Sequence, residues 1–178
     1  MDFDFISGNV SLDFVGTLEN RATTRHEVLR STHALAEWVK AARLVTRPIN
    51  VQLKDLEAAI KLREAIYDLT VAYLAKKPPK QSDLAIVNDA CKADRSQPGL
   101  KAFGKVHREE SMATALATIA RAAIELLGGD DRQFVRYCQG IDCMRLFVDK
   151  SSLKNRRWCE MKMCGNQAKV AAYRRRQQ

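Results

Sequence analysis

Four cysteines decide the fold at the end of this chain: Cys138-Gln-Gly-Ile-Asp-Cys143 and Cys159-Glu-Met-Lys-Met-Cys164, with fifteen residues between the two pairs. Two close cysteine pairs at such a separation are typical of a zinc site with four thiolate ligands. Gly140 lies inside the first turn, where a glycine gives the backbone room to bend around an ion. We therefore predict one structural zinc ion bound by all four cysteines.

Other uses of these cysteines fit the sequence less well. Disulfides need an oxidising compartment, and Met1-Asp-Phe-Asp-Phe-Ile6 lacks the basic start and long apolar core of a signal peptide, so we expect a cytoplasmic protein. Thioredoxin-like redox chemistry uses cysteines with two intervening residues, whereas these pairs have four. Four protein ligands also leave no open position for a catalytic water. We therefore expect the metal to be structural.

The sequence around the cysteines predicts a small module over residues 131–178. Residues 132–137 resemble a short strand leading into the first cysteine, and residues 145–149 resemble a second strand. Residues 156–159 are predicted to pair back onto 145–149 as a β-hairpin. Asn166 is predicted to cap a last helix that runs to about Arg176. A β-hairpin followed by a helix at a four-cysteine site is a treble-clef-like arrangement.

The preceding residues, 1–130, are predicted to form a separate helical domain. Apolar residues recur at spacings of three and four in segments beginning near residues 31, 51, 82 and 107, and glycines or prolines end most of them. The apolar residues between Phe3 and Val15 are expected to pack on these helices. Residues 94–104 are predicted to form a loop or short hairpin, and Cys91 a small core residue. The fold class is therefore mainly α.

Positive charge is concentrated in the cysteine module. The chain carries a formal net charge of +9, and residues 138–178 hold ten Lys and Arg against three acidic residues. The module therefore has a net charge of +7, and the first 137 residues are nearly neutral. Such asymmetry indicates a polyanionic partner, usually nucleic acid. A solvated tail that only improves solubility has the same composition.

Two stretches resemble known families. The segments Cys143-Met-Arg-Leu-Phe-Val-Asp-Lys-Ser151, Asn155-Arg-Arg-Trp-Cys159 and Cys164-Gly-Asn-Gln-Ala-Lys169 closely resemble the CGNR zinc finger, with Gln167 in place of the Arg of that name. The segment Ser11-Leu-Asp-Phe-Val-Gly-Thr-Leu-Glu-Asn-Arg21 resembles the start of the helical ABATE domain, which usually has Asn where this chain has Gly16. This domain precedes the finger in many bacterial proteins. The resemblance implies a transcription regulator.

These observations together predict a zinc-dependent, DNA-binding transcription regulator. Its helical domain would serve as a sensor of a small-molecule effector or as a homodimerisation unit. The alternative is an adaptor that uses the same finger to bind protein or RNA. The sequence contains no P-loop, dinucleotide fingerprint or G-x-S-x-G motif, so we do not expect an enzyme. No apolar run approaches the ~18 residues of a membrane span, so we expect no membrane partner.

The predicted nucleic-acid contacts lie on the hairpin and the last helix. Lys169, Arg174, Arg175 and Arg176 are predicted to contact phosphates, and Arg156 or Gln167 to reach a base edge. Arg157 belongs to the same candidate set. Because side chains alternate along a strand, only one of Arg156 and Arg157 is expected to face a ligand. Trp158 is expected to pack on the zinc core.

Overall fold

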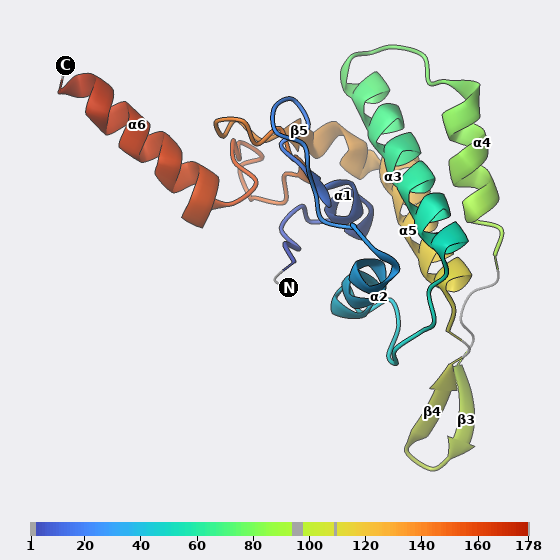
Figure 1. Ribbon diagram of the computed structural model, residues 1–178. Coiled ribbons are helices and arrows are strands. Elements are labelled where there is room, and N and C mark those ends of the chain that lie inside the picture. Colours follow the sequence, from blue (N-terminus) through green and yellow to red (C-terminus); the bar gives the residue numbers. More distant parts are fainter. Residues whose placement is uncertain (1–2, 94–97, 109, 178) are drawn as a thin grey trace.

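The computed structural model describes residues 3–93, 98–108 and 110–177, and its architecture is mainly α, as predicted (Figure 1). The helical body contains α1 (Val10–Val15), α2 (Thr32–Ala41), α3 (Leu53–Leu74), α4 (Gln81–Ala90) and α5 (Met112–Gly128). It also contains two short antiparallel ribbons, β1 (Leu18–Glu19) with β2 (His26–Glu27) and β3 (Pro98–Ala102) with β4 (Lys105–Arg108). The cysteine module follows, with the 3-10 turn η1 (Asp130–Phe134), β5 (Val135–Tyr137), β6 (Leu146–Val148), the π-helical turn η2 (Met161–Gly165) and α6 (Asn166–Arg176).

Side-chain caps fix where helices α2 and α5 begin. Ser31 accepts a hydrogen bond from the Ala34 N–H at the start of α2, and Ser111 accepts one from Thr114 at the start of α5. Each bond satisfies an amide that has no partner within the helix. The cap at Ser111 corrects the prediction that this helix begins near residue 107. Residues 105–108 instead form strand β4, which confirms a short hairpin in this part of the chain.

One apolar core joins the helices of the body. The short helix α1 lies at its centre, with Leu12 and Phe14 fully buried, so the apolar amino-terminal segment packs on the helices as predicted. The Phe14 ring lies 5.2 Å from the Trp38 ring of α2. Helix α4 runs along α3 and α5 and buries only Val87 among its residues. Cys91, just beyond α4, is partly buried and packs against this core.

A buried charge network ties the β1–β2 segment to α3. The Arg63 side chain is only 2% exposed and donates hydrogen bonds to Glu27 at 2.7 Å and to Glu64 at 2.8 Å. Arg21 donates to the same Glu64 at 2.6 Å. Burial raises the pKa of both glutamates, but the arginines outweigh it, so the pKa of each is lowered. The network is therefore formed by ionised groups on both sides.

The cysteine module shares the core of the body through its two strands. Strand β6 pairs with β5 in antiparallel register, with Val135 opposite Val148. Because side chains alternate along a strand, Leu146 and Val148 enter the core of the body while Phe147 packs among the cysteines. The predicted pairing of 145–149 with 156–159 is therefore wrong. The partner strand is β5, which covers only Val135–Tyr137 of the predicted strand 132–137, because residues 132–134 belong to η1. The chain reversal between β5 and β6 contains the first two cysteines.

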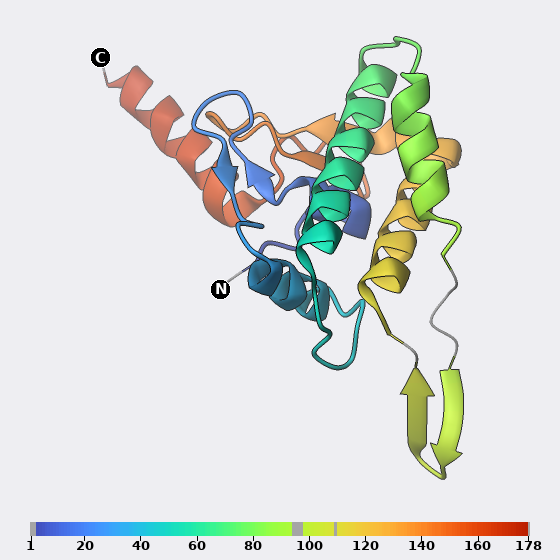
Figure 2. The same cartoon turned by 45° about the vertical axis from the view of Figure 1, so that its right-hand side comes forward.

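Two elements project from opposite ends of the molecule. In both views helix α6 extends away from the body on one side and the β3–β4 ribbon on the other (Figures 1 and 2). None of the eleven residues of α6 is buried. Within the described residues, no helix combines the length and apolarity needed to cross a membrane.

Candidate metal centre and basic helix

The four predicted zinc ligands meet at one point. The Sγ atoms of Cys138, Cys143, Cys159 and Cys164 all lie within 4.8 Å of one another. Cys159 Sγ is 3.7 Å from Cys143 Sγ and 3.8 Å from Cys164 Sγ. A tetrahedron with Zn–S bonds of about 2.3 Å has edges of about 3.8 Å. These separations fit zinc and exclude disulfide bonds, in which the two sulfurs are about 2.05 Å apart.

Tight turns in the backbone bring the first two cysteines into this cluster. Asp142 and Met144 adopt positive φ angles of 61° and 47° on either side of Cys143. A Cβ atom at Gly140 would lie 2.8 Å from Cys164 Sγ, so only glycine allows the two cysteine pairs to approach this closely. The backbone N–H groups of Gly140 and Cys159 point at Cys138 Sγ, at 3.3 and 3.2 Å. Such hydrogen bonds stabilise a thiolate.

The electrostatics of the cluster favour a bound cation. Hydrogen bonds from Cys143 and Cys159 lower the pKa of Cys138 to about 2. The pKa of Cys159 is raised by its hydrogen bond to Cys138, and burial together with the charge at Cys143 raises the pKa of Cys164 to about 12. One thiolate therefore opposes ionisation of its neighbours. A divalent ion removes this repulsion and allows all four to bind as thiolates. The four cysteines form a structural site for one zinc ion, as predicted.

Asp149 organises the loop between the two cysteine pairs. Its side chain is fully buried and accepts hydrogen bonds from the N–H and Oγ of Ser151 and from the N–H of Arg156. These bonds outweigh the effect of burial and lower the pKa of Asp149. Asp149 is not among the functional residues predicted from the sequence. An Asp two residues before a Ser is typical of a turn stabilised by its own side chain, and that signal could have revealed it.

The two arginines of this loop have different environments. Arg156 is partly buried, with its guanidinium 4.8 Å from the Phe147 ring and donating to the carbonyls of Trp158 and Cys159. Arg157 is exposed and donates to Gln139 Oε1 at 2.7 Å. Arg156 thus faces inward and Arg157 outward, which agrees with the prediction that only one of the two faces a ligand. The cause is the loop held by Asp149, because residues 156 and 157 are not in a strand. Trp158 packs against the cysteine cluster, as predicted.

Helix α6 begins at the metal centre. Cys164 lies in η2, which continues directly into α6, so an ion at Cys164 fixes the start of the helix. Asn166 does not cap the helix, contrary to the prediction, because the preceding residue, Gly165, already has helical backbone angles. The side-chain Nδ2 of Asn166 instead donates a hydrogen bond to the Lys162 carbonyl. The side chains predicted to bind nucleic acid from this helix are all exposed; they are Gln167, Lys169, Arg174, Arg175 and Arg176.

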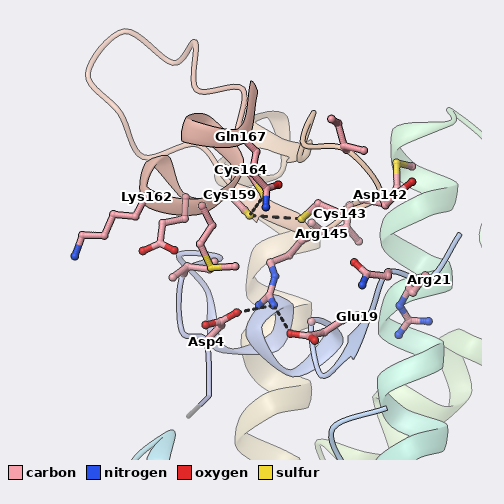
Figure 3. Close-up of a pocket in the computed structure, with 18 of the residues that line it drawn as sticks. Asp4, Glu19, Arg21, Asp142, Cys143, Arg145, Cys159, Lys162, Cys164 and Gln167 are labelled. Atoms are coloured by element: carbon pink, nitrogen blue, oxygen red, sulfur yellow. Dashed lines mark hydrogen bonds and ion pairs between the residues drawn. The ribbon is translucent and has the colours of Figure 1, made fainter. Parts of the chain in front are cut away.

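A groove of about 900 Å³ separates α6 and the metal centre from the body (Figure 3). On the body side Arg145, 9% exposed, lies between two carboxylates, with Nη2 3.0 Å from Asp4 and 3.2 Å from Glu19. A Cβ atom at Gly16 would lie 2.8 Å from Arg145 Nη1, so the glycine makes room for this guanidinium. The opposite wall includes Gln167 and Arg174 of α6.

Comparison with protein families gives two matches in the order expected from the sequence. Residues 8–130 match the ABATE family, described as a "putative stress-induced transcription regulator". Residues 135–177 match the CGNR zinc finger, so the second match includes all four cysteines and the whole of α6. None of the curated proteins compared with the chain matches it.

Proposed function

The chain belongs to the family of ABATE-domain proteins with a CGNR zinc finger, and we propose that it regulates transcription by placing helix α6 on duplex DNA. The single observation that carries the proposal is the exposure of α6. An isolated helix of eleven residues is marginally stable in water, and helices in proteins normally bury one face. Helix α6 buries none of its residues, and the metal centre fixes only its start. Its surface is therefore available to a partner. The major groove of B-DNA accepts an α-helix.

The charges of α6 suit a groove lined by phosphates. Lys169 and Arg176 lie on one side by their spacing of seven, and Arg174 lies on the side that lines the groove toward the body. Basic side chains around the helix can therefore reach both phosphate walls of the DNA groove. We propose phosphate contacts for Lys169, Arg174, Arg175 and Arg176.

Base recognition is assigned to residues at the start of the helix. Gln167 is exposed there, and its amide can pair with an adenine edge. Arg157 is exposed beside the metal centre and joins the proposed contact set. Arg156 does not, because its guanidinium is already bound to backbone carbonyls within the module. We assign it the role of holding the loop on Phe147.

The decisive measurement is duplex binding of the zinc-loaded chain across about 50–300 mM salt. We expect log K to fall linearly with log salt, with a slope of about −0.9 for each phosphate contact. The variant Arg174→Ala/Arg175→Ala/Arg176→Ala should have a slope shallower by up to about 2.7. Removing zinc with a chelator should abolish specific binding, because the start of α6 is then no longer fixed.

A matched control separates contact with DNA from loss of net charge. Lys54, Lys61 and Lys77 are exposed residues of the α3 region, and replacing them with Ala removes the same three charges. This control should keep the parent slope. Equal loss in both triple variants, or no duplex binding at low salt, would show that α6 is not the DNA contact. An RNA or protein partner of the finger would then be the better hypothesis.

This function involves binding and no catalysis. Four cysteine ligands close the coordination of zinc, so the metal has no position for a substrate. A regulator of transcription acts in the cytoplasm of a bacterial cell, which agrees with reduced thiols and a zinc site.

A further inference from the structure

We propose that the groove between α6 and the body binds a small amphipathic organic cation. The first observation is a concentration of exposed apolar side chains. Ile141, Met144, Met163 and Val170 are 66%, 42%, 56% and 48% exposed, and all four line this groove. Large apolar side chains gathered in one exposed hollow are typical of a binding site. The two methionines can adjust their shape to ligands of different outline.

The second observation is the charge at the inner wall. Asp4 and Glu19 are 43% and 33% exposed and share the single guanidinium of Arg145, with His26 beside the other oxygen of Glu19. Over the whole groove, four acidic side chains balance four basic ones, so the excess of negative charge comes from the zinc centre; the acidic residues are Asp4, Glu19, Asp142 and Glu160, and the basic ones are Arg21, Arg145, Lys162 and Arg174. Cys143, Cys159 and Cys164 line the same groove, and a zinc ion with four thiolates carries a net charge of −2. The inner wall thus favours a positive group.

The dimensions and position of the groove select the class of ligand. A volume of about 900 Å³ lies within the range of small-molecule sites, and such sites often form where two domains meet. Nucleic acid is unsuitable for this wall because its phosphates would face Asp4 and Glu19. A molecule with an apolar body and an ammonium or phosphonium centre satisfies both the apolar side chains and the carboxylates.

Binding at this position would influence α6. Met163 precedes the helix and Val170 lies on it, whereas Asp4 and Glu19 belong to the body, so a bound cation contacts both sides. It would therefore fix the orientation of α6 relative to the body. This regulatory consequence, but not the binding itself, rests on the proposed function.

Tetraphenylphosphonium and tetraphenylborate provide a direct test, since they have nearly the same shape and opposite charge. Binding of each to the full zinc-loaded chain is measured by calorimetry in the absence of DNA. We expect the phosphonium to bind about tenfold or more tightly than the borate. Equal binding of both ions, or no binding of the phosphonium, would overturn the proposal.

Variants locate the site. Glu19→Gln keeps a hydrogen-bond acceptor for Arg145 but removes a charge, and should weaken phosphonium binding about tenfold. Val170→Ser, at an exposed position that the fold does not need, should weaken it as well. Leu153→Ser is the matched control, because Leu153 is 78% exposed and lies outside the groove. Unchanged binding in both groove variants, or an equal loss in the control, would refute this location.

A further experiment with DNA tests the groove site and the proposed function separately. Adding the phosphonium to the protein–DNA complex should change the affinity for duplex at least about threefold, and the Glu19→Gln variant should reduce this response. If the phosphonium binds as expected but the protein binds no duplex, the groove site stands and the proposed function fails. If duplex binds but the phosphonium does not, the opposite holds.

Discussion

Leu146→Ala tests whether the finger and the helical body are one folding unit. Leu146 belongs to the cysteine module, yet its side chain is 1% exposed and lies in the core of the body. The substitution removes three carbon groups, worth about 0.8 kcal/mol each, and the cavity left behind adds to this cost. We expect a loss of about 3–4 kcal/mol in the free energy of unfolding. In a protein of this size that loss lowers the Tm by about 6–15 °C.

The neighbouring residue supplies the control. Phe147 is fully buried but faces the cysteines, and its ring lies beneath the Arg156 guanidinium. Phe147→Ala should therefore weaken zinc binding, measured by competition with a chelator, and should shift the helical unfolding transition less than Leu146→Ala. Leu146→Ala should show the reverse pattern, with the helical transition shifted and zinc affinity nearly kept.

Far-UV circular dichroism during heating and during urea titration follows the helical body in both variants. A helical midpoint for Leu146→Ala within about 1 °C of the parent would refute the reasoning. The finger would then fold independently, and the burial of Leu146 in the body would contribute no stability.

Three further tests address the cysteine turn, the buried charge network and the β3–β4 ribbon. Gly140→Ala should reduce zinc affinity about tenfold or more in chelator competition, because the added Cβ would lie 2.8 Å from Cys164 Sγ. Acid should weaken the Arg63 network. In the folded protein the pKa values of Glu27 and Glu64 lie below the ordinary value of 4.5. The stabilisation from these two carboxylates is therefore complete above pH 4.5 and is lost as the pH falls through the lowered folded-state pKa values. Urea unfolding at about pH 7 and about pH 3 should show this loss, and Arg63→Met should show less of it. Phe103→Ser should leave the free energy of unfolding within about 0.5 kcal/mol of the parent, because this side chain is fully exposed at the tip of the β3–β4 ribbon. A larger change in thermal unfolding would show that the ring has a partner within the chain.

The sequence by itself determined the local features of this protein. The spacing of Cys138, Cys143, Cys159 and Cys164 predicted the zinc site, since a tetrahedral ion restricts which short turns can hold it. Apolar periodicity predicted the main helices for a similar reason, because a helix repeats every 3.6 residues whatever lies around it. Apolar periodicity predicted the ends of the helices less accurately, since α5 begins at Met112 and not near residue 107.

Only the tertiary structure decided which surfaces meet. The residues of a strand do not specify which other strand it pairs with, so the pairing of β6 with β5 could not be predicted from residues 145–149. The different environments of Arg156 and Arg157 depend on a loop fixed by buried Asp149. The inner wall of the groove beside α6 is formed where Arg145 meets two distant carboxylates. Arg145 lies 141 and 126 residues from Asp4 and Glu19 in the chain, where local spacing imposes no constraint. The Asp149 contacts are local, but the complete burial of this carboxylate depends on the packing of the whole module.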